Sequence, residues 1–194
     1  MPFDVGDRID HYQLGELIGH GSMADVFCAE DLEKNRTVAL KIIHRHLLDQ
    51  KFIIERVIRE VESLSSLRHP NIIRLYDHSI KPSLAYLAME YVDGPTLEEE
   101  LERYSRRNGK VPLSKVLSWM EAIASAVDHA HQNGLVHRDI KPANVLFRQD
   151  GSPVLMDFGL AFLIGSPRIS ISNTISGTPA YLSPEQARGE VGDG

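Results

Sequence analysis

A glycine-rich stretch near the N-terminus has the residue types that bind phosphate groups. Its sequence is Ile18-Gly19-His20-Gly21-Ser22-Met23-Ala24-Asp25-Val26. Glycines at positions 19 and 21 let the backbone come close to a bulky anion, and the N–H groups of such a turn can point at phosphate oxygens. A dinucleotide-binding turn has the same spacing, but it opens a helix and has an acidic residue about 20 positions later. Here the strand-like Val26-Phe27-Cys28 follows, and the later region offers Lys41. A plain hairpin turn is the other alternative.

A lysine in an apolar strand is the second feature that suggests chemistry. Lys41 ends the run Val38-Ala39-Leu40-Lys41. Because a buried ammonium without an anion is costly, its side chain must reach water or pair with an acid. Glu60, which lies 19 residues later on the next predicted helix, is a candidate partner. A lysine that faces solvent from an edge strand is the alternative.

The most specific feature is a set of motifs in a fixed order. His137-Arg138-Asp139-Ile140-Lys141-Pro142-Ala143-Asn144 is followed, thirteen residues after its end, by Asp157-Phe158-Gly159. Gly177-Thr178-Pro179-Ala180-Tyr181-Leu182-Ser183-Pro184-Glu185 comes next. With the glycine-rich stretch, Lys41 and Glu60, these motifs resemble the protein kinase family, in its serine/threonine branch, over residues 12–190. The last motif resembles the bacterial, eukaryotic-like (Hanks-type) kinases.

The resemblance implies a catalytic role for four residues. Asp139 would orient the substrate hydroxyl and accept its proton, and Lys141 would steady the transferring phosphate. Lys41 would contact the α- and β-phosphates of ATP and would be held by Glu60. A lysine two residues after the aspartate is typical of the serine/threonine branch.

The resemblance also implies Mg²⁺ as a cofactor and a set of residues around the nucleotide. Asn144 and Asp157 would supply oxygen ligands to Mg²⁺. Met89 would be the gatekeeper of an adenine site. The residues that would contact ATP are Ile18, Gly19, His20, Gly21, Ser22, Met23, Ala24, Asp25, Val26, Ala39, Lys41, Glu90, Val92 and Leu146. Each apolar member can equally be a core residue, and Ala24 replaces the third glycine of the family's motif.

Regulatory positions follow from the same resemblance. Arg138, beside Asp139, is a ready partner for a phosphorylated residue on the predicted loop 160–176. The candidates on that loop are Ser170, Ser172, Thr174 and Ser176, of which position favours Thr174. Ordinary solvated hydroxyls are the alternative. Thr178 would hydrogen-bond near Asp139. Leu64, Leu75, His137 and Phe158 match the family's apolar stack, for which a structural role is primary.

Apolar periodicity predicts the elements that position these motifs. Strands are predicted at 12–19, 25–30, 37–43, 72–78, 84–92, 145–148 and 153–156. Helices are predicted at 52–67, 97–107 and 113–132, with Gly134 at the C-cap of the last. Asp93-Gly94-Pro95 breaks the chain, and 164–178 has the composition of a mobile loop.

The expected fold is α+β, bilobal and protein-kinase-like. Residues 1–11 would be an N-terminal extension, 12–92 an N-lobe of antiparallel β-sheet plus a helix, and 93–194 a partial, mostly α-helical C-lobe. The family's domain continues past the motif that ends at Glu185, so the resemblance implies a truncated domain. Glu185 would lack its arginine partner, and apolar surface of the 113–132 helix would be uncovered.

Composition limits the function further. The net charge of −6 over 194 residues argues against a general nucleic-acid binder. The single Cys28 excludes an internal disulfide, and no apolar stretch reaches the roughly 18 residues of a membrane span. The N-terminus lacks the features of a secretion signal. We expect a cytoplasmic domain, whose parent protein could be membrane-anchored through a missing C-terminal part.

The expected function is transfer of the γ-phosphate of ATP to Ser/Thr hydroxyls of proteins, including the activation loop of the chain itself. A nucleotide-binding but catalytically weak fragment or scaffold is the alternative. An unstable gene fragment without function is the third possibility.

Overall fold

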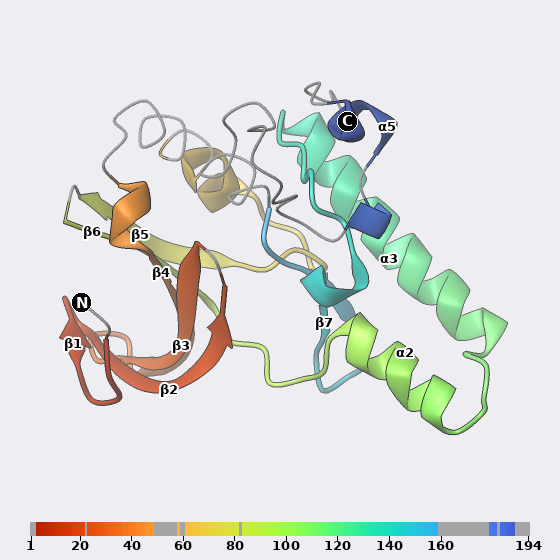
Figure 1. The fold of residues 1–194 in the computed structure, drawn as a ribbon, viewed down its shortest axis with the longest axis horizontal. Helices are drawn as coiled ribbons and strands as arrows, with labels where there is room; N and C mark the ends of the chain where they lie inside the picture. Colours follow the sequence, from red (N-terminus) through yellow and green to blue (C-terminus); the bar gives the residue numbers. More distant parts are fainter. Residues whose placement is uncertain are drawn as a thin grey trace. The chain divides into compact units, whose positions relative to one another are not determined.

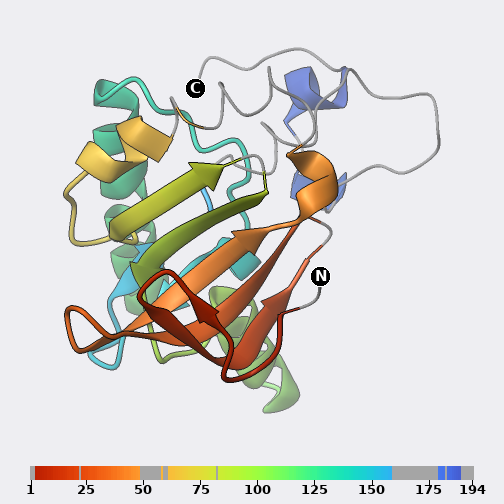
Figure 2. The same cartoon turned by 90° about the vertical axis from the view of Figure 1, so that its left-hand side faces the viewer.

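The first part of the chain forms an antiparallel sheet, as its alternating apolar residues predict. The computed structural model describes residues 3–21, 23–48, 58, 61–81, 83–158, 179–181 and 183–188. Six strands lie in the order β1-β2-β3-β4-β6-β5 (Figures 1 and 2). Their bounds are β1 (Arg8–Ile9), β2 (Tyr12–His20), β3 (Ala24–Asp31), β4 (Arg36–Ile43), β5 (Leu75–Lys81) and β6 (Leu84–Glu90), and a short turn η1 (Arg45–Leu47) follows β4.

The chain divides into two compact units. The first comprises Met1–Ser66 and Arg74–Val92, and the second comprises Leu67–Ile73 and Asp93–Gly194. Leu67–Ile73, expected in the N-lobe, thus groups with the second unit. The reason is its backbone pairing: the Ile73 N–H donates to the Leu155 carbonyl at 2.9 Å, and the Leu155 N–H donates to the Asn71 carbonyl at 2.8 Å.

One face of the sheet carries a cluster of buried apolar side chains, called here the core cluster. Because side chains alternate along a strand, every second residue of β3, β4 and β6 points to this face. The cluster consists of Ile9, Tyr12, Leu14, Phe27, Ala29, Val38, Leu40, Ile42, Tyr86 and Ala88. The residues between them in these three strands therefore lie on the opposite face of the sheet.

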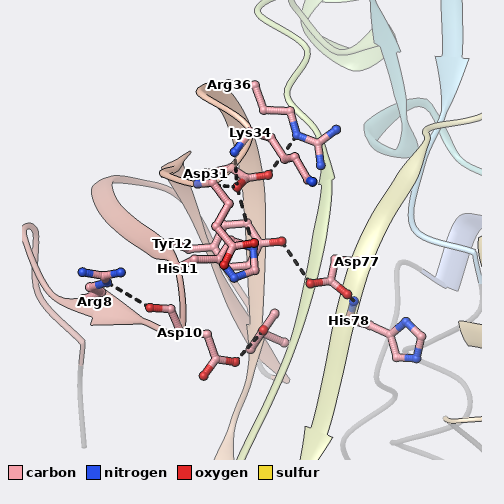
Figure 3. A network of polar contacts seen from close by, with 11 residues as sticks. Arg8, Asp10, His11, Tyr12, Asp31, Lys34, Arg36, Asp77 and His78 are labelled. Atoms are coloured by element: carbon pink, nitrogen blue, oxygen red, sulfur yellow. Dashed lines mark hydrogen bonds and ion pairs between the residues drawn. The ribbon is translucent and has the colours of Figure 1, made fainter.

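Residues of the expected N-terminal extension join this sheet. β1 pairs with β2, with Ile9 opposite Tyr12. The Tyr86 hydroxyl donates to Asp10 Oδ2 at 2.7 Å. The Tyr12 hydroxyl donates to Asp77 Oδ2 at 3.2 Å (Figure 3). Burial is the main cause that raises the pKa of both tyrosines above the ordinary value. These contacts tie the start of the chain to β5 and β6.

A buried carboxylate fixes the turn that joins β3 to β4. Asp31 is fully buried and accepts a hydrogen bond from Arg36 Nε at 3.0 Å (Figure 3). Its Oδ1 accepts the Lys34 N–H at 3.1 Å. Burial acts to raise the pKa of Asp31, but the hydrogen bonds from Arg36 and Lys34 outweigh it, so the pKa lies below its ordinary value.

The described part of the second unit contains two longer helices, a four-residue helix and a short hairpin. Its elements are α2 (Leu97–Arg106), α3 (Leu113–Gln132), η2 (Pro142–Asn144), β7 (Val145–Phe147), β8 (Pro153–Leu155), η3 (Pro179–Tyr181) and α5 (Pro184–Ala187). The observed bounds of α3 are the predicted ones. Trp119 of α3 packs against Phe147 of β7, with ring centroids 4.9 Å apart. The exposed apolar residues of α3 are Leu113, Leu117 and Met120.

Local sequence explains how these helices begin and end. Thr96 and Glu99 form a reciprocal capping box at the start of α2, with the Glu99 N–H donating to Thr96 Oγ1 at 3.1 Å. Gly134 has a φ of +73° and the Leu135 N–H donates to the Ala130 carbonyl at 3.0 Å, which closes α3. The C-cap residue of α3 is Asn133, so Gly134, which was predicted at the C-cap, lies one position later, where a left-handed residue ends the helix.

One predicted strand starts later in the structure, and one predicted helix lies partly outside the described residues. The strand predicted at 72–78 starts later, at Leu75, because Ile72 bridges Leu155 in the second unit. Of the helix predicted at 52–67, residues 61–66 are helical, with Val61 and Leu64 buried. Most of its first half, and the whole predicted loop 164–178, lie outside the described residues. Among the helices that are described, none combines the length and apolar character needed to cross a membrane.

Candidate active site

The carboxylate of Asp139 is held by two side chains of its own loop. Asn144 Nδ2 donates to Asp139 Oδ2 at 2.8 Å and to the Asp139 carbonyl at 2.7 Å. Lys141 Nζ lies 2.9 Å from the same Oδ2. Neither side-chain contact occupies Oδ1, and the Asp139 side chain is 30% exposed. The loop therefore presents one oriented carboxylate oxygen to an approaching molecule.

A buried histidine, His137, forms hydrogen bonds to the backbone of Asp139 and of Met156. His137 is 1% exposed, and its Nε2 lies 2.9 Å from the Met156 carbonyl. Since a carbonyl only accepts, Nε2 carries the hydrogen. The Asp139 N–H donates to Nδ1 at 3.2 Å, so the ring is neutral. Burial lowers the pKa of His137 below its ordinary value, although the Met156 hydrogen bond and the nearby charges of Asp139 and Asp157 act in the opposite direction.

Asp157 follows β8 in a backbone conformation that is rare for residues other than glycine. Its φ is +60°. Such strain costs about 1–3 kcal/mol and persists only where surrounding contacts fix the chain. Here the preceding Met156 N–H donates to the Asn144 carbonyl at 2.9 Å. On the other side, the buried Phe158 ring packs on His137, with centroids 4.5 Å apart. The contacts on either side thus hold the backbone at Asp157.

The chemistry of Asn144 and Asp157 fits the predicted magnesium site. Both hydrogen bonds of the Asn144 side chain to Asp139 use Nδ2, so they do not occupy its amide oxygen. Within the described ranges, no group of three His, Cys, Asp or Glu side chains is arranged to hold a metal ion. An ion bound by one amide oxygen and one carboxylate needs further oxygens, which is the usual way Mg²⁺ binds with phosphate groups and water.

The sheet register of the first unit brings four predicted nucleotide-site residues together. Val26 pairs with Lys41 across β3 and β4, and Ala39 pairs with Met89 across β4 and β6. All four lie on the face opposite the core cluster, because their strand neighbours belong to that cluster. This face therefore has apolar side chains next to one ammonium group.

The hairpin between β2 and β3 contains the glycine-rich stretch. Asp25 Oδ1 lies 2.6 Å from His20 Nδ1, and its Oδ2 lies 3.2 Å from His44 Nε2. The His44 N–H also donates to the Met23 carbonyl at 2.8 Å. Gly19 has no positive φ, and a Cβ there would meet Val26 at an ordinary 3.5 Å. The fold itself therefore leaves room for a side chain at position 19.

Glu90, Val92 and Leu146, which were predicted to contact adenine, lie at the end of β6, just after it and in the middle of β7. Glu90 ends β6, and its N–H donates to the Arg74 carbonyl at 2.8 Å, so this N–H is not the group that meets a base. Val92 is the last residue of the first unit. In the second unit, Leu146 is partly exposed between two buried neighbours of β7 and pairs with Val154.

Some predicted residues cannot be located, and two residues with structural contacts were missed. Ser22, Glu60, Thr174 and Thr178 lie outside the described residues. His44, which binds Asp25, and Gln186, which donates to the Arg138 carbonyl, were not among the predicted residues. The spacing Ser183 to Gln186 is a capping-box signal for a helix start, but it gives no indication of the contact to the loop.

Comparisons with known proteins agree on the family. The family description "Protein kinase domain" matches residues 12–192. Serine/threonine-protein kinase PrkC of Bacillus subtilis is 45% identical over 95% of this chain and 28% of its own length. Serine/threonine-protein kinase PknB of Mycolicibacterium smegmatis is 36% identical over 95% of this chain and 30% of its own length. The chain therefore spans less than a third of either relative.

A solved structure shares the fold. The crystal structure of the Mycobacterium tuberculosis PknI kinase domain superimposes with a TM-score of 0.78 at 27% identity, covering 99% of this chain and 71% of that one. The two compact units and the antiparallel sheet of the first are thus those of a partial, bilobal kinase-like fold.

Proposed function

Because the chain belongs to the protein kinase family, we propose that it transfers the γ-phosphate of ATP to serine or threonine hydroxyls of proteins, including hydroxyls of its own activation segment. ATP and a protein substrate are the proposed partners, and the net charge of −6 favours a protein over a nucleic acid. Since ATP is the donor, we assign the activity to the cytoplasm.

The arrangement around Asp139 is the observation that supports this proposal. A general base must lie within hydrogen-bond reach of the proton that it accepts. Asn144 and Lys141 both bind Oδ2, so Oδ1 is the oxygen that a substrate hydroxyl would meet. The partial exposure of the side chain gives a hydroxyl access to it. A carboxylate fixed in this way needs little reorganisation when the proton moves.

The proposed step is a direct transfer between two oxygen atoms. The hydroxyl oxygen forms a bond to the γ-phosphorus, and the bond from that phosphorus to the bridging oxygen breaks, which releases ADP. The hydroxyl proton passes to Oδ1 of Asp139. The ammonium group of Lys141, which lies next to this carboxylate, would neutralise charge on the transferring phosphate.

The first unit would bind the nucleotide through the face that carries Lys41. Its apolar residues Val26 and Ala39 suit a flat purine, and the ammonium of Lys41 suits the α- and β-phosphates. Gly19 supports this assignment. Because the fold leaves room for a Cβ at this position, the glycine is better explained by a ligand that approaches the backbone closely.

Mg²⁺ would be held by the amide oxygen of Asn144 and the carboxylate of Asp157. When bound, the ion would neutralise negative charge on the phosphate oxygens. For the other predicted residues we keep the roles that the family implies: Glu60 as the partner of Lys41, Glu90, Val92 and Leu146 at the adenine, and Arg138, Thr174 and Thr178 in regulation.

Replacement of Asp139 tests the proposed function. With radiolabelled ATP and a protein substrate, Asp139→Asn should lower phosphate incorporation at least about 100-fold, because a carboxamide cannot accept the hydroxyl proton. The matched control is Asp128→Asn, an exposed carboxylate of α3 that accepts a hydrogen bond from Gln132 at 2.8 Å. It should keep the wild-type rate.

Equal incorporation by the wild type and Asp139→Asn would contradict the proposal. Thermal stabilisation by ATP without any phosphate transfer by the wild type would favour the alternative, a nucleotide-binding scaffold with little or no catalytic activity.

A further inference from the structure

Both polar groups of the peptide that joins Arg138 to Asp139 are bound by side chains. Its carbonyl, on Arg138, accepts a hydrogen bond from Gln186 Nε2 at 2.7 Å. Its N–H, on Asp139, donates to His137 Nδ1 at 3.2 Å. The two side chains therefore fix the plane of this peptide, and with it the direction in which the Asp139 side chain leaves the backbone.

The backbone at Arg138 has a conformation that is stable only when neighbouring contacts hold it. Arg138 has a φ of +63°, in the left-handed region that side chains other than glycine disfavour. Rotation of the peptide would relieve this conformation, and it would turn the Asp139 carboxylate away from its present direction. Two hydrogen bonds to one peptide oppose that rotation because both would break together.

Gln186 is itself held in place within α5. Its side-chain oxygen accepts the Ser183 N–H at 3.0 Å, and its own N–H lies 3.4 Å from Ser183 Oγ. The amide nitrogen of the side chain is thus aimed at the Arg138 carbonyl. The start of α5 and the orientation of Asp139 are linked through this one side chain.

We propose that Gln186 is a positioning residue for Asp139, which acts by holding the Arg138–Asp139 peptide and does not touch the substrate. This inference rests on the proposed phosphotransferase function. It predicts that loss of the Gln186 donor lowers the rate of transfer more than it lowers the affinity for either substrate.

Gln186→Glu isolates the contact. A glutamate still accepts the Ser183 N–H, so the capping box is kept, but it has no hydrogen to donate to the Arg138 carbonyl. We expect kcat to fall about tenfold, the equivalent of one hydrogen bond, and KM for ATP to change less than twofold. Gln132→Glu, the same substitution on the exposed face of α3, is the control and should keep the wild-type kcat.

Amide hydrogen exchange gives a readout that is independent of activity. In the wild-type chain the Asp139 N–H is bound to His137 and should exchange slowly. In Gln186→Glu the peptide is released at one end, so exchange at Asp139 should become about tenfold faster while exchange in the middle of α3 is unchanged. Gln186→Met, which has neither a charge nor a hydrogen-bond donor at this position, should show the same change.

The two measurements separate this inference from the proposed function. A Gln186→Glu protein with wild-type kcat and wild-type exchange at Asp139 would overturn the positioning role. A raised KM for the protein substrate at unchanged kcat would also overturn it, since Gln186 would then serve binding. If the wild type transfers no phosphate, the proposed function fails, and the exchange rates of Asp139 decide whether the peptide is held by Gln186.

Discussion

At the scale of single residues, Asn144 has two tasks that use different atoms. Its side-chain nitrogen donates both to the carboxylate and to the carbonyl of Asp139. Its own carbonyl accepts the Met156 N–H, directly before Asp157. Asn144 thus connects the backbone at Asp139 with the backbone next to Asp157. Since its side chain is 5% exposed, water cannot easily replace these contacts.

Asn144→Ala should therefore cost both stability and activity. Removal of the amide leaves Asp139 without its neutral donor, and we expect the free energy of unfolding to fall by about 1–3 kcal/mol. Urea denaturation followed by the fluorescence of Trp119, the single tryptophan, measures this. Asn133→Ala, which removes an exposed hydrogen bond to the His129 carbonyl, is the control and should cost about 0.5 kcal/mol or less. Equal losses in the two variants would contradict the role given to Asn144.

At the scale of elements, the start of α2 is fixed by a close backbone approach to β7. The Phe147 N–H donates to the Pro95 carbonyl at 2.9 Å, and Thr96 bridges Leu146. A Cβ on Gly94 would lie 1.8 Å from the Phe147 carbonyl oxygen. Only glycine permits this approach, so the chain break predicted from Asp93-Gly94-Pro95 has a packing reason as well as a turn-forming one.

Gly94→Ala should separate α2 from β7. Because the clash is with backbone, no rotamer change can relieve it, and we expect the free energy of unfolding to fall by about 2–3 kcal/mol. Gly109→Ala is the matched control, since its nearest neighbour would be the Tyr104 carbonyl oxygen at 3.6 Å. That variant should stay within about 0.5 kcal/mol of the wild type in the same urea titration. A stable Gly94→Ala protein would show that the approach is not required.

At the scale of the whole molecule, the two units contain buried groups that respond to opposite ends of the pH range. In the first unit, burial raises the pKa of Tyr12 and Tyr86, so their contribution to stability is lost at high pH. In the second unit, burial lowers the pKa of His137. Burial and the neighbouring His129 likewise lower the pKa of His69. As pH falls below about 6.5, the second unit should therefore lose stability first. Asp31 of the first unit, whose pKa lies below its ordinary value, responds only in the more acidic range of a carboxylate.

The direction in which pH changes the stability of the second unit can be tested. A histidine whose pKa is lower in the folded state binds fewer protons there, so stability is present above the unfolded pKa of about 6.5 and is lost as pH falls below it. The urea midpoint reported by Trp119 should decrease between about pH 7.5 and pH 5.5. His69→Gln should show a smaller decrease, whereas His131→Gln, at an exposed position, should match the wild type. Parallel curves for wild type and His69→Gln would contradict the assignment.

Local sequence rules were sufficient where partners lie close in the chain. Asp139, Lys141 and Asn144 belong to one short motif, so its resemblance to the protein kinase family already predicted a joint site, and the structure brings their side chains together. The same rules placed both ends of α3, where apolar periodicity and Gly134 agree.

Local sequence rules could not predict contacts between segments that are distant in the chain. Gln186 lies 48 positions from Arg138, and nothing in either segment indicates that one amide would meet that carbonyl. The start of β5 was predicted too early because the apolar Ile72 looks like a strand residue, whereas it belongs to the second unit and pairs with Leu155 there. Register and long-range pairing depend on the assembled fold.

The path of the chain has a consequence for any covalent dissection of the protein. The polypeptide enters the second unit at Leu67, returns to the first after Ile73, and enters the second again after Val92. Cleavage after Val92 would therefore leave the seven residues Leu67–Ile73, which belong to the second unit, covalently attached to the first. The fully buried Leu155 would lose the carbonyl of Asn71 and the N–H of Ile73, its partners in the backbone. A free-standing second unit would have to recover that peptide by complementation in trans or by circular permutation.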